Sequence, residues 1–220
     1  LWQIGNDKAL KALSHNSQPT SEPYRPVQAL RAIYQFVGQN RGGKVIVFSS
    51  WLPTLLELRD LLRSRYASDQ IAEFHSGIAD ECLQEQADRF QRDDRCQILL
   101  CDELGGEGRN FQAAQQIIHL DLPWTPAQLE QRIGRVDRIG RTGIVVSVVL
   151  YASDTLEADL YRLWQDAFQL FTQSMSGMEI ALDDIQSELL ATLRESSRYG
   201  VSQLLPSMRK RAEELRKQVE

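Results

Sequence analysis

The sequence lacks several features that would assign it to a common class of protein. It has only three cysteines, Cys82, Cys96 and Cys101, with no CxxC pair and no histidine at zinc-ligand spacing, which argues against a zinc module and a disulfide framework. No apolar run approaches transmembrane length and the N-terminus has no signal-peptide pattern, so we expect no membrane partner and a reducing, cytoplasmic location. Because the chain begins with Leu1 rather than Met, we expect a fragment of a longer protein.

A net positive charge is also missing. The formal net charge is -5 over 220 residues, of which 42% are hydrophobic. This composition supports a real core and excludes a uniformly basic nucleic-acid-binding protein, although a local basic patch can still supply phosphate contacts. The length fits one domain with an appendage, or two small domains.

Short apolar runs alternate with amphipathic segments in the first two thirds of the chain. Apolar runs at 45–48, 71–74, 97–101, 116–120 and 145–150 predict strands, and helical spacing predicts helices over 26–39, from Pro53, and over 80–91. This alternation, with short connections, is typical of an α/β fold in which helices cover both faces of a parallel sheet.

Polar residues gather where these predicted strands end. Ser49 and Ser50 follow the first strand, the segment 75–77 the second, the segment 102–110 the third, and Asp121 the fourth. Because ligands of such folds bind outside the carboxyl ends of the strands, we expect the functional site at this edge.

A glycine-rich stretch follows the third strand. Gly105, Gly106 and Gly108 fall within four positions, and such backbone can approach a ligand closely. A turn of this kind that leads into a helix is a common anion site. The stretch is not a P-loop, because the pattern GxxxxGK[ST] is absent from the chain. A tight turn without a ligand is the alternative.

Arginines concentrate in the segment 128–141. Arg132, Arg135 and Arg138 recur every three residues, so on a helix they share one broad face. Their rigid, fork-shaped guanidinium groups suit phosphate oxygens and can offset charge on a transferring phosphoryl group. A solvated basic helix end, favoured by the helix dipole, explains the segment equally well when it is taken alone.

The two ends of the chain differ from the middle. Residues 1–24 read as a linker because small polar residues and prolines cluster there. Residues 155–220 read as a helical extension, with helices over 155–173 and 179–196, a turn at 196–200, and a last helix from about 206 to 219. Leu205, Met208, Ala212, Leu215 and Val219 form a short heptad-like stripe in that last helix, which we expect to pack against the domain or against sequence outside this chain.

Four motifs in order make the family recognisable. They are Phe-Ser-Ser-Trp at 48–51, His-Ser-Gly at 75–77, Gly-Gly-Glu-Gly-Arg-Asn-Phe-Gln at 105–112 and Gln-Arg-Ile-Gly-Arg-Val-Asp-Arg-Ile-Gly at 131–140. Together they resemble the second RecA-like domain of superfamily 2 helicases, and within that group the Snf2 family, closest to its bacterial RapA-like branch. The resemblance implies a RecA-like domain over residues 25–154.

The resemblance also implies roles for individual residues. Matching the family's motifs implies that the paired arginines reach nucleotide phosphates as catalytic residues, and these are Arg135 and Arg138. It implies a second set that contacts or orders the nucleotide: Gly106, Gly108, Asn110 and Gln131. A third set lies near the nucleic-acid backbone: Ser49, Ser50, Cys101 and Asp102. The His-Ser-Gly motif is expected to be mainly structural, and no metal ligand is expected in this chain.

By this resemblance the chain is the C-terminal motor half of an ATP-dependent nucleic-acid translocase. The cofactor is ATP with Mg²⁺, whose ligands and phosphate cradle belong to an N-terminal RecA-like domain, so the fragment alone is expected to be inactive. Double-stranded DNA is the expected track, and RNA polymerase is a candidate protein partner. The alternatives are a non-catalytic interaction module and a strand-separating DNA or RNA helicase.

Overall fold

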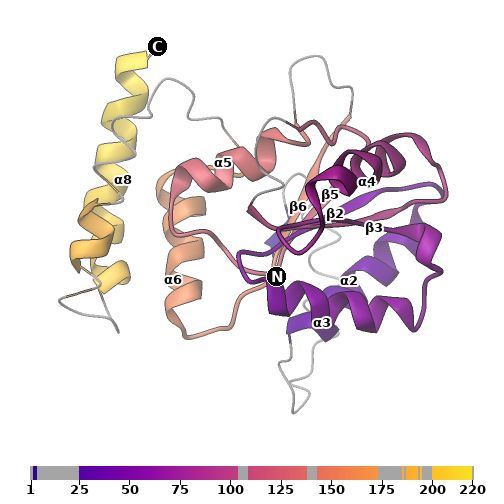
Figure 1. Cartoon of the computed structure of the whole chain (residues 1–220). Helices are drawn as coiled ribbons and strands as arrows, with labels where there is room; N and C mark the ends of the chain where they lie inside the picture. The colour runs from indigo at the N-terminus through magenta and orange to yellow at the C-terminus, as the bar shows by residue number, and fades with distance from the viewer. Residues whose placement is uncertain are drawn as a thin grey trace. The chain divides into compact units, whose positions relative to one another are not determined.

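The computed structural model describes residues 2–3, 25–103, 109–137, 143–172, 185, 187–192, 194 and 200–219. It contains a six-stranded sheet with the strand order β1-β6-β5-β2-β4-β3 (Figure 1). The strands are β1 (Trp2–Gln3), β2 (Val45–Phe48), β3 (Ile71–Phe74), β4 (Ile98–Cys101), β5 (Gln116–His119) and β6 (Val146–Val149). Neighbours among β2 to β6 pair in parallel, and β1 pairs antiparallel with β6.

Helices cover both faces of the sheet, which confirms the predicted α/β class. In Figure 1, α2 (Arg25–Gln39) and α3 (Leu52–Arg63) lie on one side of the sheet and α4 (Asp80–Arg92) lies on the other. Alternate strand residues face opposite sides. Val45 and Val47 therefore join the core with α2 and α3, whereas Ile46 and Phe48 join the core with α4. Since both faces are buried, the strands are continuously apolar.

The parallel register brings the ends of the central strands to one edge. Phe48, the last residue of β2, pairs with Cys101 of β4 on one side and with His119 of β5 on the other. The residues that follow these three strands therefore start from the same edge of the sheet. This is the carboxyl edge at which the sequence predicted the functional site.

The chain forms two compact units. The sheet unit comprises Leu1–Asp121 and Arg132–Leu150, and the helical unit comprises Leu122–Gln131 and Tyr151–Glu220. The sequence placed one boundary near residue 154 and did not anticipate that 122–131 groups with the later helices. No helix that the structure describes is long and apolar enough to cross a membrane.

The helical unit contains α6 (Leu156–Arg162), the π-helix η3 (Leu163–Ala167) and α8 (Gly200–Val219). The indole of Trp164 is fully buried and donates a hydrogen bond to the carbonyl of Pro123 at 3.1 Å. This bond ties the short segment 122–131 to η3 within the unit. The predicted helix over 179–196 lies largely outside the described residues, although 187–192 are helical.

The predicted start of the last helix was wrong. The helix α8 begins at Gly200 rather than near Pro206, which lies inside it. Proline removes one backbone donor and disfavours a helix interior, but Pro206 is exposed and the buried stripe runs along the opposite residues Val201, Leu204, Met208 and Ala212. The stripe packs within the helical unit, against η3 and α6, and it runs through Leu204 rather than Leu205.

The expectation that Arg132 and Arg135 share one helix face was wrong. The helix α5 (Pro126–Gly134) ends at a glycine, which has low helix propensity. Arg135 and Val136 form a turn in which the amides of Val136 and Asp137 both donate to the carbonyl of Ile133. Arg132 and Arg135 therefore do not share one helix face.

At the opposite edge of the sheet, Lys44 closes the end of α4. Its ammonium group donates to the carbonyls of Phe90 at 2.5 Å and Asp93 at 2.8 Å, and it is 5% exposed. The last carbonyls of a helix have no partner within the helix, and Lys44 supplies one from the start of β2. Burial lowers the pKa of Lys44, and electrostatic interactions with Cys96, Asp94 and Asp93 raise it by a smaller amount.

Substituting Lys44→Met is expected to lower the free energy of unfolding by about 1–3 kcal/mol, because it leaves two carbonyls without their donor. Urea denaturation followed by circular dichroism measures the change. Arg95→Met is the control: its side chain is 73% exposed and its ion pairs are at the surface, so its effect should be within about 1 kcal/mol. Equal effects of the two substitutions would contradict the role of Lys44.

Candidate functional site

The candidate site begins with a carboxylate at the carboxyl edge. Asp121 follows β5 and is 6% exposed. Its carboxylate accepts hydrogen bonds from the Ser49 hydroxyl, from the Ser50 amide at 2.9 Å and from the Ser50 hydroxyl at 2.9 Å. The loop after β2 is thereby fixed to the end of β5. A buried carboxylate needs such donors to offset its desolvation.

Arg132 completes this cluster from the end of α5. Its guanidinium donates to the Asp121 carbonyl and to the Ser50 hydroxyl oxygen, both at 2.8 Å, and lies 3.2 Å from the Asp121 carboxylate. A weaker contact of 3.4 Å reaches the carboxylate of Glu103, which lies 2.9 Å from the Ser50 hydroxyl and competes with Asp121 for its one hydrogen. Arg132 is 3% exposed. We call Ser49, Ser50, Glu103, Asp121 and Arg132 the rim cluster.

Arg135 docks on the segment that follows the glycine-rich stretch. Its guanidinium donates to the carbonyl of Arg109 at 3.2 Å, and its own carbonyl accepts from the amide of Phe111 at 2.8 Å. Phe111 is fully buried against Phe74 and Phe90. Because Phe111 anchors the segment in the core, Arg135 is placed at the carboxyl edge by two hydrogen bonds to fixed backbone.

The His-Ser-Gly turn after β3 is held by two carboxylates. The amide of Gly77 donates to Nδ1 of His75 at 3.1 Å, which leaves Nε2–H to donate to Glu73 at 3.0 Å. Asp102 accepts from the amide of Ser76 at 2.8 Å. A Cβ at Gly77 would lie 3.2 Å from the His75 ring, so the turn favours glycine. These contacts support a structural role for the motif.

The structure brings only part of the predicted site together. Ser50 and Asp102 lie at the carboxyl edge, each in hydrogen bonds to neighbouring segments. Ser49 and Cys101 lie there as well, but both are fully buried, so their side chains are shielded from a nucleic-acid strand. Burial raises the pKa of Cys101 well above its ordinary value, and a neutral thiol is expected.

The predicted nucleotide residues are described unevenly. Gly106, Gly108 and Arg138 lie outside the described residues. Asn110 is exposed, with its side-chain oxygen accepting from the amide of Gln112 at 3.1 Å. Gln131 is exposed on α5. Their predicted contacts with nucleotide stay predictions.

The sequence interpretation missed the central member of the rim cluster. Arg132 was noted for its spacing and Asp121 for its place after a strand, but neither was assigned a role. Pairing them would have required knowing that α5 ends beside β5, which is a tertiary contact. The available signal was one carboxylate at a strand end followed by arginine eleven residues later. That signal alone has little specificity.

His119 and Trp51 have contrasting environments at the same edge. His119 is fully buried, and burial, followed by the nearby Arg132, lowers its pKa well below the ordinary value. It is therefore neutral, as expected for a core histidine. Trp51 directly precedes α3, at its N-cap, and is 66% exposed.

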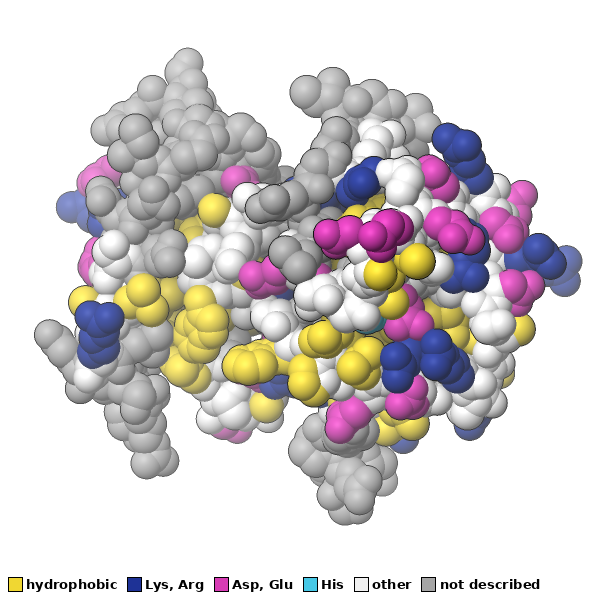
Figure 2. Space-filling view, viewed as in Figure 1, with side chains coloured by type: hydrophobic (Ala, Val, Ile, Leu, Met, Phe, Trp, Pro, Cys, Tyr) yellow, Lys and Arg dark blue, Asp and Glu magenta, His cyan; other side chains and the backbone are white. Residues whose placement is uncertain are grey.

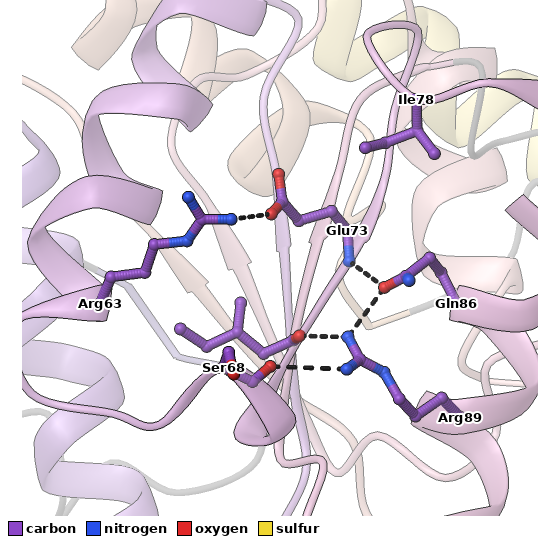
Figure 3. Close-up of a pocket in the computed structure, with 7 residues that line it drawn as sticks. Arg63, Ser68, Glu73, Ile78, Gln86 and Arg89 are labelled. Carbon is purple, nitrogen blue, oxygen red and sulfur yellow. Dashed lines mark hydrogen bonds and ion pairs between the residues drawn. The ribbon is translucent and has the colours of Figure 1, made fainter. Parts of the chain in front are cut away.

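A separate cavity of about 220 Å³ lies at the β3 end of the sheet. Figure 3 shows Arg63, Glu73, Gln86 and Arg89 around it. Gln86 accepts from the amide of Glu73 at 3.3 Å, and Arg89 donates to the carbonyl of Ile71. These side chains from α4 occupy backbone groups that an edge strand would otherwise offer to another strand. The side chains that line the cavity therefore protect the edge of the sheet from further strand pairing.

Residues that could hold a metal ion do not cluster in the part of the chain that the structure describes, where no group of three or more His, Cys, Asp or Glu is arranged for it. Asp102 and Asp121 bind backbone amides and a buried arginine instead.

The parallel sheet, its strand-end polar loops and the arginine-bearing turn after α5 define a RecA-like helicase domain. Residues 28–140, just over half of the chain, match the family model described as the helicase conserved C-terminal domain. The chain belongs to this family.

Similar proteins agree with that assignment. The RNA polymerase-associated protein RapA of Yersinia pestis (strain Pestoides F) is 37% identical over 166 residues, which cover 75% of this chain and 17% of that protein. The chain thus spans about a sixth of the length of the curated relatives that it matches. This similarity confirms the predicted resemblance to the RapA-like branch.

Solved structures support the fold. The Sulfolobus solfataricus SWI2/SNF2 ATPase core in complex with dsDNA aligns with a TM-score of 0.59 and 20% identity over 80% of this chain and 35% of that chain. The C-terminal part of the Fun30 ATPase domain aligns with a TM-score of 0.57 and 22% identity, over 84% of this chain and 60% of that chain. These likenesses confirm the RecA-like fold.

The Glu73–His75 contact predicts a pH dependence of stability. Burial raises the pKa of Glu73, but the hydrogen bond from His75 and the charges of Arg59 and Arg63 outweigh it, so the pKa lies below the ordinary value of 4.5. A lowered folded-state pKa means that the carboxylate stabilises the fold above that value, and that this contribution disappears as pH falls through the folded-state pKa.

Glu73→Gln should therefore reduce the free energy of unfolding near neutral pH, with the difference from the unmodified protein shrinking between about pH 5 and about pH 3. Urea denaturation at several pH values measures this difference. Glu85→Gln, at an exposed position of α4, is the matched control and should show little change. A difference for Glu73→Gln that does not vary with pH would refute the assignment.

Proposed function

We propose that the chain is the C-terminal motor half of an ATP-dependent translocase that moves on nucleic acid. The observation that carries the proposal is the placement of Arg135, 9% exposed at the carboxyl edge and fixed by Arg109 and Phe111. Its guanidinium would contact the phosphates of an ATP bound to an N-terminal RecA-like domain, together with Arg138. An arginine supplied from a second domain stabilises the charge that develops on the transferring phosphoryl group.

The proposed site is half of an ATPase. The pattern of a phosphate-binding P-loop is absent from the sequence, and the carboxylates of the rim cluster are engaged with Ser49, Ser50 and Arg132. ATP with Mg²⁺ would therefore be cradled by the N-terminal domain. This chain would close on the nucleotide with its arginines, and the nucleotide-dependent opening and closing of two domains would drive movement.

The proposed track is double-stranded DNA. It is supported by the similar SWI2/SNF2 core, which was solved with dsDNA, and by the position of Ser50 at the carboxyl edge. Figure 2 shows Lys and Arg interspersed with Asp and Glu over the sheet unit, at the right of the view. On that face, binding would rest on individual contacts rather than on one extended positive field. The RNA polymerase association of RapA makes a polymerase a candidate partner of the helical unit.

In the full-length protein, Arg135→Ala should reduce nucleic-acid-stimulated ATP turnover by about a thousandfold or more, the typical effect of removing an arginine finger. Turnover is measured with and without double-stranded DNA, single-stranded DNA and RNA, which also identifies the track. Arg31→Ala, on the exposed face of α2, is the control and should retain activity.

A folded Arg135→Ala protein with near-normal turnover would overturn the arginine-finger assignment. Absence of turnover under every condition, in a folded unmodified protein, would favour a non-catalytic interaction module. Strand separation, assayed on the same substrates, would favour a helicase.

The 220-residue chain by itself should show no ATP turnover above background and poor nucleotide affinity, since it supplies only one side of the site. Turnover by the isolated chain, retained after repurification and lost on Arg135→Ala, would show that the ATP site is complete within it and would contradict the proposal. Calorimetric titration with ATP and Mg²⁺ checks the affinity.

A further inference from the structure

We propose that Arg132 is a positioning residue that couples the loop carrying Ser50 to the turn carrying Arg135. The inference rests on the function proposed above and adds to it a physical connection between the nucleic-acid side and the nucleotide side of this domain. Arg132 is buried, so it would act through its neighbours rather than by touching ATP or nucleic acid.

The first half of the connection is the forked contact of Arg132 with two segments. One nitrogen, Nη1, donates to the Asp121 carbonyl and the other, Nη2, donates to the Ser50 hydroxyl oxygen, each at 2.8 Å. The guanidinium also lies 5.7 Å from the ring centroid of Phe48, the last residue of β2. Both branches of the fork are thus used at the carboxyl edge, one on a strand end and one on the loop after β2.

The second half of the connection is the short path from Arg132 to Arg135. Only Ile133 and Gly134 separate them, and the Ile133 carbonyl accepts from the two amides that follow Arg135. The Arg135 carbonyl is itself held by the Phe111 amide at 2.8 Å. A shift of Arg132 would therefore be transmitted through a hydrogen-bonded turn rather than absorbed by a loose loop.

The hydrogen bonds of Ser50 would change when a nucleic-acid phosphate binds beside it, because a hydroxyl has one hydrogen to donate. That hydrogen has two acceptors within reach, Glu103 and Asp121, each at 2.9 Å, while the oxygen accepts from Arg132. A backbone phosphate that takes this hydrogen would release it from the carboxylates. The Asp121 carboxylate would then depend more heavily on Arg132, 3.2 Å away, which alters the position of the guanidinium.

The chemistry requires arginine rather than any cation. A planar fork can hold Asp121 and Ser50 at once, whereas a lysine ammonium is a point charge on a flexible stem. Arg132→Lys keeps the buried positive charge beside Asp121, so the protein should remain folded while the connection to Ser50 is weakened. Arg132→Gln removes the charge as well and tests whether charge alone suffices.

The test is performed on the full-length protein with the nucleic acid that stimulates it most. For Arg132→Lys we expect the ratio of stimulated to unstimulated ATP turnover to fall by about ten- to a hundredfold, the effect of misplacing a catalytic group by about 1 Å. The loss should appear in kcat, with the Kd for nucleic acid near that of the unmodified protein. Arg132→Gln should lose at least as much, and thermal melts establish that each variant is folded.

Two further variants make the result specific. Ser50→Ala combined with Arg132→Lys should lose no more stimulation than the more severe single variant, because both act on one contact. Arg25→Gln is the matched control, since Arg25 donates at 3.2 Å to the carbonyl of Leu120, next to Asp121. It should retain the stimulation ratio.

The outcomes separate the two proposals. Suppose that nucleic acid stimulates ATP turnover of the unmodified protein and that folded Arg132→Lys keeps the same ratio of stimulated to unstimulated turnover. This result overturns the coupling but not the motor function. Independent, multiplicative losses in the double variant, or equal loss of stimulated and unstimulated turnover, also overturn the coupling. A folded unmodified protein without turnover overturns both.

Discussion

The buried ion pair between Arg132 and Asp121 is the contact on which the carboxyl edge depends. Each group would be costly to bury alone, and each is stabilised by the other together with Ser49, Ser50 and a backbone carbonyl. Removing one partner leaves an uncompensated buried charge. The pair therefore forces three segments, the loop after β2, the end of β5 and the end of α5, to assemble in one arrangement.

This arrangement is possible because the sheet is parallel. The register that aligns Phe48 with Cys101 and His119 places the loops after β2, β4 and β5 along one edge. Buried apolar faces on both sides of the sheet fix that register, since a slip of one residue would exchange the two faces. Core packing and site geometry are therefore consequences of the same strand pairing, and the family's motifs fall where that pairing brings chain segments together.

The edge strand β3 and the carboxyl edge of the sheet differ in how their polar groups are covered. At the β3 end, Gln86 and Arg89 occupy backbone groups of the strand, which closes it to further pairing. At the carboxyl edge, by contrast, Ser50 and Trp51, the last residues of the loop between β2 and α3, are exposed beside buried charge. The polar groups of β3 are thus covered by side chains of α4, whereas Ser50 and Trp51 at the carboxyl edge stay exposed.

The sequence by itself determined the five parallel strands, the alternation of helices with them, and the edge at which the polar loops gather, because two-sided burial makes strands such as Val45–Phe48 continuously apolar. It did not predict β1, whose two residues Trp2–Gln3 fall in the segment read as a linker and are held by pairing with β6. It did not determine where α5 ends or which arginine is buried. Three-residue spacing treats Arg132 and Arg135 alike, yet one pairs with Asp121 and the other with the backbone of Arg109. Only the tertiary structure decided this, because those partners are distant in sequence and meet only when the sheet has formed.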